Sequence, residues 1–410
     1  MARLWTWLVA LLCGAYLNVR DRSCENTSNP GPKKVVFILW SRACKWPDKT
    51  LWIRRDDATR MIPRKFLAPS LICICILSLP TPVGFAGAST PSSRRLLTLD
   101  TAIAEATKLP RLHSMLASVR GELVLERYFN GTKSTRLANI KSVSKSVVSA
   151  LVGIAIEQRK IPNVKQPISH YFPELLKDER QTLKQQITVE DLLTMRSGLE
   201  STSNRNYGAW VLSPNWVRHA LSRPMLSPPG TTMIYSTGNT HLLSAILTKA
   251  TGKSTWQYAQ ETLAKPMGFT LAPWMQDPQG IYFGGNEMTL TPRQMLAFGE
   301  MYLQGGKAKG VQVVPSEWVE TSLKARTVSR RESDRFYGYG WWVRELAGYQ
   351  TYYAWGYGGQ FIFLVPDLDL VVAVTSVSEP GAERRDHLGA IYDIVESSII
   401  PVVAQDTALF

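Results

Sequence analysis

Two residues at the start of an apolar segment could do nucleophilic chemistry. In NIKSVSKSVVS, residues 139–149, Ser142 precedes Lys145 by three positions. On a helix this spacing places the hydroxyl and the amine on one face, close enough to exchange a proton. A serine hydroxyl needs a base to accept its proton, and burial would lower the pKa of the lysine amine enough for it to serve. This pair alone is equally consistent with a structural role, in which Ser142 caps a helix and Lys145 lies in solvent.

A tyrosine further along the chain could move the same proton. Tyr235, in PPGTTMIYSTGN, follows a tight turn at Pro228-Pro229-Gly230 and precedes an expected helix. A phenol beside an ammonium group ionises more easily, and it can relay a proton from a serine to a leaving group. The alternative is a tyrosine packed in the core.

Three glycines mark a third candidate segment, AWGYGGQFIF, residues 354–363. Gly356, Gly358 and Gly359 fall within a stretch whose pattern predicts a strand. Glycine weakens a strand and is unfavourable there unless another backbone or a ligand must approach closely. We therefore expect this segment to border a site.

These three stretches, in this order, resemble the serine β-lactamase and penicillin-binding-protein superfamily, with its S-x-x-K, Tyr-x-Asn and Lys-Thr-Gly or His-x-Gly motifs. The resemblance spans about residues 95–400, and LLTMRSGL, YGYGWW and GYGGQ are similar to the class C-like branch, which includes 6-aminohexanoate-dimer hydrolases and β-lactamase-like carboxylesterases. It implies that Ser142 is the acylated nucleophile, Lys145 its base partner and Tyr235 the proton relay. It also implies an oxyanion hole made by the backbone N–H groups of Ser142 and Gln360.

Two positions depart from the family pattern. Thr237 stands where the second motif has its Asn, with Asn239 two residues later, and both are expected among the substrate-binding residues. Tyr357 stands where a Lys or His is usual, and it completes the expected substrate-binding set with Gly358 and Gly359. Because a neutral phenol gives up most of the attraction for a substrate carboxylate, we expect an esterase or small-amide hydrolase in preference to an efficient β-lactamase.

Other reactive groups fit this chemistry less well. His241 lies near Tyr235 in the sequence, where a groove or core position is more common than a catalytic base. Glu200 precedes Tyr235, the wrong order for a water-activating carboxylate, and Glu190 and Asp191 are expected to start a helix as favourable first-turn charges. The sequence has no G-x-S-x-G elbow, no H-E-x-x-H zinc motif and no phosphate loop, and we expect neither a metal nor a cofactor.

The elements that must position these residues predict an α+β fold. Residues 98–116 have the apolar spacing of an amphipathic helix, residues 116–131 that of two strands, and residues 142–158 that of a helix buried on every side. Helix-period segments with Gly and Pro between them follow, and residues 337–377 indicate successive strands before a closing helix at 386–404.

We expect a β-lactamase-like antiparallel sheet flanked by the terminal helices, with an inserted, mostly helical subdomain. The sheet part should comprise about residues 95–141 and 336–400, and the helical part about residues 142–335. The site is expected in the groove between the two parts.

Composition and charge set further bounds. The chain has 410 residues, of which 45% are hydrophobic and 20% charged, as is typical of globular proteins. Its formal charge of +14 is uneven, with 13 Lys and Arg against 5 Asp and Glu in residues 1–88 but 34 against 28 in residues 89–410. No basic run with interleaved aromatics follows residue 95, so no nucleic-acid partner is expected. All five cysteines lie in the first 75 residues, which excludes a thiolate-metal cluster or disulfide scaffold in the main domain.

An apolar segment near the N-terminus is expected to direct export. Residues 61–88 combine a basic start, an apolar centre and small residues at the end, the order of a secretory signal peptide, with cleavage after Ala88. A membrane anchor is the alternative, although the apolar part is short for a span and Pro69 and Pro80 interrupt it.

An internal signal peptide indicates that Met61 is the natural start and that residues 1–60 are an upstream extension, although MARLWTWLVALLCGAYL could act as an anchor of its own. We expect residues 89–410 to form the mature hydrolase domain, periplasmic or secreted, without a stable membrane span after cleavage.

The sequence as a whole predicts an exported, cofactor-free serine hydrolase that cleaves a small ester or amide through an acyl-enzyme on Ser142. Two alternatives remain open. One is a catalytically silent penicillin-binding-like module that binds peptidoglycan or a partner in the same groove. The other is a D,D-peptidase or β-lactamase.

Overall fold

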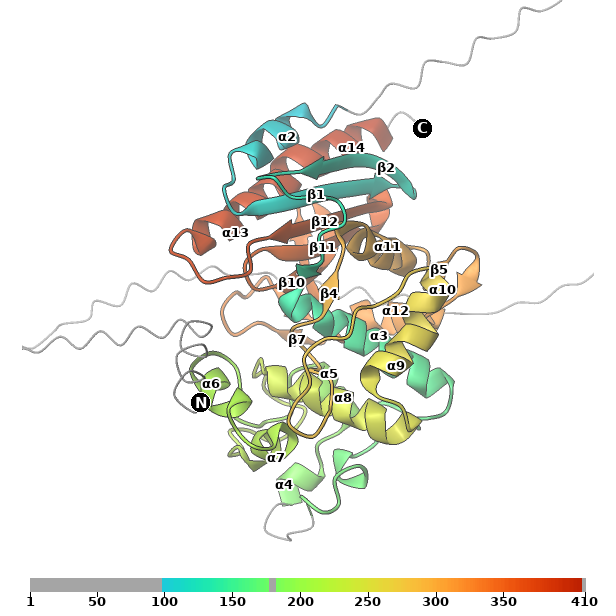
Figure 1. The fold of residues 1–410 in the computed structure, drawn as a ribbon, viewed down its shortest axis with the longest axis vertical. Helices are drawn as coiled ribbons and strands as arrows, with labels where there is room; N and C mark the ends of the chain where they lie inside the picture. Colours follow the sequence, from blue (N-terminus) through green and yellow to red (C-terminus); the bar gives the residue numbers. More distant parts are fainter. Residues whose placement is uncertain (1–97, 177–181, 408–410) are drawn as a thin grey trace, which may run out of the picture. The chain divides into compact units, whose positions relative to one another are not determined.

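An eight-stranded antiparallel sheet is the framework of this protein, for which the computed structural model describes residues 98–176 and 182–407. The predictions for residues 1–60 and 61–88 lie outside the described residues. Both ends of the described chain contribute strands, since β1 pairs with β12 (Figure 1). In spatial order the strands are β2 (Glu122–Tyr128), β1 (Leu112–Val119), β12 (Leu370–Ser376), β11 (Gln360–Val365), β10 (Tyr349–Gly356), β9 (Trp342–Leu346), β8 (Phe336–Tyr337) and β7 (Thr327–Val328).

The central strands are continuous apolar runs because both faces of the sheet are covered. Along β11, Phe361 and Phe363 enter one hydrophobic cluster while Ile362 and Leu364 enter the other, as the two-residue period of a strand requires. The second face is covered by α11 (Pro292–Leu303), in which Gly299 lets the helix approach the β11 and β12 side chains. The first face is covered by α2 (Asp100–Thr107), α13 (Arg384–Asp393), the π-helical turn η7 (Ile394–Ile399) and α14 (Ile400–Thr407) (Figure 1).

The first predicted helix is shorter than expected. α2 ends at Thr107, and Pro110, which has no amide hydrogen to donate, follows shortly after. The prediction that the helix continues through residues 112–116 is wrong, because these residues belong to β1 and pair with β12, starting at Leu112 opposite Ser376. Tertiary pairing overrides the helical spacing here.

The buried helix that follows the first two strands is α3 (Ser144–Glu157), and twelve of its residues, from Ser144 to Ala155, are buried. This agrees with the prediction of a helix surrounded by the core. The remaining α-helices are α4 (Thr182–Gln185), α5 (Val189–Leu193), α6 (Tyr207–Val211), α7 (Trp216–Ser222), α8 (Thr237–Thr251), α9 (Thr255–Ala259), α10 (Lys265–Met267) and α12 (Ser316–Leu323).

Short elements complete the chain. Two small sheets pair β3 (Ala138–Asn139) with β4 (Thr289–Leu290) and β5 (Lys307–Ala308) with β6 (Val311–Gln312). The helical turns are η1 (Lys141–Val143), η2 (Ile168–His170), η4 (Asn204–Asn206), η5 (Gln260–Ala264) and η6 (Pro366–Leu368). The predicted α+β class, an antiparallel sheet flanked by helices, is confirmed, although the sheet begins earlier than residue 336, at β7, and α11 packs on the sheet itself.

The helical segment near the C-terminus is long and apolar. By length and composition alone, the helical segment Arg384–Asp406 could cross a membrane. Its buried residues, among them Ile391, Val395 and Ile399, lie in the hydrophobic cluster beneath the sheet. A helix whose apolar side packs on a core in this way is common in globular domains.

Candidate active site

Ser142 lies in a strained turn at the entrance to the buried helix. It is the middle residue of η1, which runs directly into α3. Lys141, just before it, has φ of 49°, a left-handed conformation that non-glycine residues rarely adopt. This backbone is fixed on both sides, because the Lys141 N–H donates to Asn139 Oδ1 at 3.0 Å and Ser144 Oγ donates to the Lys141 carbonyl at 2.5 Å. Such strain is typical of functional sites.

Lys145 is buried, and only 2% of the residue is exposed. Its Nζ is 2.9 Å from Ser142 Oγ, 2.8 Å from the Gly285 carbonyl oxygen and 3.3 Å from Thr237 Oγ1. Burial lowers the pKa of the amine from 10.5 to about 7. The alternative of a solvated Lys145 is therefore wrong, and a large share of the molecules hold a neutral amine next to the serine near neutral pH.

Tyr235 reaches the same place from the segment before α8. Ser201 Oγ donates to the Tyr235 carbonyl at 2.7 Å, and the Ile234 N–H donates to the Met195 carbonyl at 2.7 Å, so the 195–201 segment holds this turn. The Tyr235 ring stacks on Trp342, with centroids 5.8 Å apart, and Lys145 Nζ lies 5.1 Å from the Tyr235 centroid. The structure thus brings Ser142, Lys145 and Tyr235 together.

The proton on Tyr235 is held more tightly than expected. Burial raises the pKa of the Tyr235 phenol to about 12, and a hydrogen bond with Ser142 only partly offsets this. The expectation that Tyr235 ionises more easily than a free phenol is therefore wrong, because desolvation of the phenolate outweighs the hydrogen bond with Ser142. A neutral phenol is suited to donate a proton, which leaves Lys145 as the base of the pair.

The glycine-rich segment forms the end of β10 and a tight turn. A Cβ on Gly356 would lie 2.3 Å from the Ile140 carbonyl oxygen, so the close backbone approach predicted for this segment exists, two residues before Ser142. Gly358 and Gly359 were expected on a strand but lie in the turn, where their φ angles of 88° and 105° are left-handed. The strand prediction for these two glycines is wrong because apolar residues on both sides of the turn give the whole stretch the pattern of a single strand.

Gln360 begins β11 directly after this turn and pairs with Gly356. Its side chain is anchored away from the turn, since Nε2 donates to the Ser376 carbonyl at 2.8 Å and Oε1 accepts from the Ser376 N–H at 3.1 Å. The turn η1, which carries Ser142, packs against both β10 and β11. This arrangement leaves the backbone of Gln360, and not its side chain, as the group that could serve the site.

The two polar residues of the second stretch have different surroundings. Thr237 belongs to the site, since its Oγ1 contacts Lys145 Nζ and lies 3.0 Å from Ser203 Oγ. Asn239 is 1% exposed, and its amide contacts Ser197 Oγ at 3.0 Å and the Met195 sulfur at 4.0 Å. This contact set argues against the prediction that Asn239 binds substrate, because both ends of its amide are engaged inside the protein.

Tyr357 is 40% exposed at the tip of the turn. The guanidinium of Arg384, the first residue of α13, lies 4.5 Å from the Tyr357 ring centroid. A positive charge therefore lies beside the Tyr357 ring, although residue 357 itself is uncharged.

The remaining acidic and imidazole candidates have structural partners. His241 is fully buried, with Nε2 3.0 Å from Asp277 Oδ2 and with Nδ1 accepting from the Gly284 N–H at 3.4 Å, so the core position expected for it is correct. Glu200 forms ion pairs with Arg223 and Arg205. Neither group contacts Ser142.

Glu190 and Asp191 lie in the first turn of α5, as predicted. Asp191 completes a capping box with Thr188, and Glu190 accepts a hydrogen bond from the Tyr339 phenol at 2.5 Å. Both carboxylates are therefore held by residues other than Ser142, Lys145 and Tyr235.

Sequence reasoning missed the segment that supplies the backbone partner of Lys145. A Cβ on Gly284 would lie 2.2 Å from the Thr240 carbonyl oxygen, and one on Gly285 would lie 3.2 Å from Lys145 Nζ. The Gly-Gly pair in YFGGNEM was the available signal, because paired glycines mark places where a backbone must approach closely.

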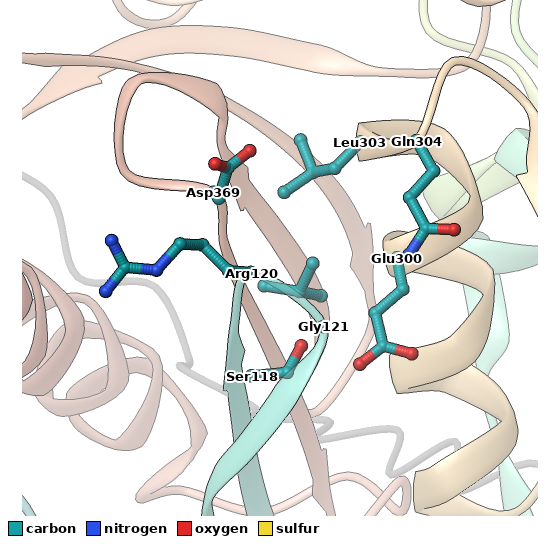
Figure 2. Close-up of a pocket in the computed structure, with 8 residues that line it drawn as sticks. Ser118, Arg120, Gly121, Glu300, Leu303, Gln304 and Asp369 are labelled. Carbon is teal, nitrogen blue, oxygen red and sulfur yellow. The ribbon is translucent and has the colours of Figure 1, made fainter. Parts of the chain in front are cut away.

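A separate hollow lies at an edge of the sheet, between the β1–β2 turn, the end of α11 and the residue after η6 (Figure 2). None of the predicted site residues lines it. Its lining residues are Ser118, Arg120, Gly121, Glu300, Leu303, Gln304, Asp369 and Val371.

The sequence is similar to that of known proteins. The family model described as Beta-lactamase matches residues 113–396. A 6-aminohexanoate-dimer hydrolase of Paenarthrobacter ureafaciens is 27% identical over 318 residues, which cover 68% of this chain and 78% of that protein.

Two solved structures share the fold. A proposed 6-aminohexanoate-dimer hydrolase from Bacillus anthracis has a TM-score of 0.61 and 19% identity, covering 77% of this chain and 84% of the other. EstCE1, a hydrolase with promiscuous acyltransferase activity, has a TM-score of 0.59 and 16% identity, covering 73% and 98%.

Proposed function

Because this chain belongs to the Beta-lactamase family and is a β-lactamase-like hydrolase, we propose that it cleaves a small ester or amide through an acyl-enzyme on Ser142. The observation that carries the proposal is the buried amine of Lys145, which lies 2.9 Å from the Ser142 hydroxyl and has a pKa lowered to about 7 by burial. A base of this strength near neutral pH is what an unactivated serine lacks.

In the proposed acylation step, Ser142 Oγ attacks the substrate carbonyl carbon while neutral Lys145 accepts the hydroxyl proton. The backbone N–H groups of Ser142 and Gln360 are the proposed donors to the oxyanion that forms. When the intermediate collapses, the carbonyl re-forms, the bond to the leaving alcohol or amine breaks, and the phenol of Tyr235 gives that group its proton. Tyr235 recovers its proton from Lys145, which becomes neutral again.

In the proposed deacylation step, the same groups act on water. A water molecule attacks the acyl carbon and gives its proton to the base, the bond to Ser142 Oγ breaks, and the serine is re-protonated as the free acid leaves. Because the 6-aminohexanoate-dimer hydrolase relative is named for a linear amide, a linear amide or its ester analogue is the substrate class that we propose.

A covalent probe tests the proposal. We expect a fluorophosphonate to add one phosphonyl group to the wild-type protein and none to Ser142→Ala, measured by intact mass. Ser149→Ala is the matched control, because Ser149 is a buried serine on the same helix, one turn beyond Lys145. Labelling or ester turnover that survives in Ser142→Ala would reject Ser142 as the nucleophile.

We also propose that the protein is exported, on the pattern of residues 61–88 alone. N-terminal sequencing of the protein recovered from its host tests this. A mature start near residue 89 supports export, and an uncleaved chain contradicts it.

A further inference from the structure

We infer that Glu287 is a positioning residue for Ser142 and Lys145, acting through a clamp formed by Asn139, Lys141 and Glu287. The inference rests on the proposed function, because it assigns a role in the same acylation step. None of the three residues of the clamp contacts the proposed reacting atoms in the described structure, so their effect would be exerted through the backbone.

The clamp is a two-armed contact of one carboxylate. Glu287 Oε1 is 3.0 Å from Lys141 Nζ, and Glu287 Oε2 accepts a hydrogen bond from Asn139 Nδ2 at 2.6 Å. The Lys141 and Glu287 side chains are only 20% and 23% exposed, which makes the ion pair less screened than a surface pair. Both arms bind the segment directly before Ser142.

The clamp joins two backbones that are both strained. Lys141 has φ of 49° and Glu287 has φ of 62°, so each holds a left-handed conformation that is unfavourable for a non-glycine residue. The two stretches also pair as β3 and β4, and the Ile140 N–H donates to the Met288 carbonyl at 3.0 Å. Conformations of this kind persist only where the surroundings enforce them, and the clamp supplies side-chain contacts that do so.

Both ends of the clamp lead to the reacting groups. Lys141 is the residue directly before Ser142, and Glu287 lies two residues after Gly285, whose carbonyl oxygen is 2.8 Å from Lys145 Nζ. The clamp therefore fixes the segment that presents the hydroxyl relative to the segment that holds the amine. Since a misplacement of about 1 Å can cost a hundredfold in rate, loosening this link would slow acylation without removing any reacting group.

The test uses Glu287→Gln and Lys141→Met in the full chain. We expect each to lower the rate of fluorophosphonate acylation and kcat for a p-nitrophenyl ester by about 10- to 100-fold, with KM changed less than about twofold. The double variant should be no slower than the slower single variant, because both substitutions break the same contact. The midpoint of the kcat/KM pH profile should also move, because the Gly285 carbonyl is no longer held against the amine.

The matched control is Glu174→Gln, which breaks another Lys–Glu contact, that with Lys249 at 3.4 Å, remote in the sequence from Ser142. It should leave all of these values unchanged. Acylation by folded Glu287→Gln within twofold of the wild-type rate, with an unmoved pH midpoint, overturns the inference even if its melting temperature falls. If Glu287→Gln does not fold, Lys141→Met decides by the same criteria. Failure of the wild-type protein to be acylated, or labelling of Ser142→Ala, would instead reject the proposed function.

Discussion

At the scale of single residues, the chemistry of the site depends on how burial acts on two ionisable groups in opposite directions. Burial lowers the pKa of the Lys145 amine and raises the pKa of the Tyr235 phenol, because in each case the neutral form is favoured. Near neutral pH this leaves a base and an acid side by side, which is the combination that proton transfer through a serine requires.

The first prediction follows from the Lys145 amine. Between pH 5 and 9 we expect kcat/KM for a neutral p-nitrophenyl ester to rise with pH and level off, with a midpoint near pH 7, because the amine must lose its proton to act as base. The Tyr235 phenol, with its pKa near 12, should impose no fall in this range. Initial rates corrected for spontaneous hydrolysis measure the profile, and a kcat/KM that stays constant from pH 5 to 9 would contradict the role of Lys145 as the base.

These residues can be predicted from the order of three motifs, but their surroundings cannot. Gly285 lies 140 positions from Lys145, and no local spacing announces that a backbone carbonyl will meet that amine. Asn239 is a second example, because its place near the second motif suggests an amide available for substrate, whereas in the structure this amide contacts Ser197 and Met195. Whether a polar group faces a site or the core depends on packing, which a single sequence does not record.

At the scale of elements, the turn between β10 and β11 has little freedom, because α13 packs behind it. A Cβ on Gly359 would lie 2.9 Å from Ile391 Cδ1 and 3.0 Å from His387 Nε2, and His387 Nε2 is 2.9 Å from Ser376 Oγ. The helix therefore sets where β11 begins, and with it the backbone of Gln360.

The second prediction concerns this turn. Gly359→Ala should lower kcat/KM at least about tenfold, because the new methyl group displaces the proposed oxyanion donor that follows it. Gly348→Ala is the matched control, since Gly348 also has a left-handed φ, 81°, but a Cβ there meets no atom within 4 Å. It should lose about 1–2 kcal/mol of stability, from chemical denaturation, and keep its kcat/KM. Equal kcat/KM values for the two variants would contradict the role given to the turn.

Predictions from the sequence were most accurate for long, strongly patterned elements. The buried helix predicted at residues 142–158 corresponds to α3, and β9 to β12 lie within the stretch predicted as strands, since their apolar runs are long, whereas β7 lies in the part predicted as helical. Residues 112–116 and the Gly358-Gly359 turn were misassigned, because a strand partner far along the chain and a left-handed turn leave only a weak trace in local hydrophobic spacing.

At the scale of the whole molecule, the buried amine of Lys145 opposes folding. The unfolded chain binds this proton below about pH 10.5, whereas the folded protein binds it only below about pH 7. Between these values the unfolded state holds more protons, so the contribution of Lys145 to the free energy of unfolding increases as pH rises from 7 to 10.5. At neutral pH the residue that we propose as the base is therefore a cost to stability.

The third prediction follows from this balance. Lys145→Met should abolish ester turnover and raise the free energy of unfolding at pH 7.5 by about 1–3 kcal/mol, after the lost hydrogen bonds are set against the removed desolvation. The gain should shrink toward pH 10. Denaturant titrations at the two pH values measure it, with Lys249→Met as a control at a half-exposed lysine. A variant that is less stable than the wild type at pH 7.5 would refute this account.

The Lys145 amine is held by a main-chain oxygen, that of Gly285, and this has an evolutionary consequence. Every amino acid carries that oxygen, so no single codon change at this position can delete the acceptor itself. A substitution can disturb the Gly285 carbonyl only by moving the loop. A side chain at Gly284 would do so, because the Thr240 carbonyl oxygen leaves no space there. Adaptation to new substrates has a freer route at the solvent-facing tip occupied by Tyr357, which can vary while the proton-handling centre behind it stays in place.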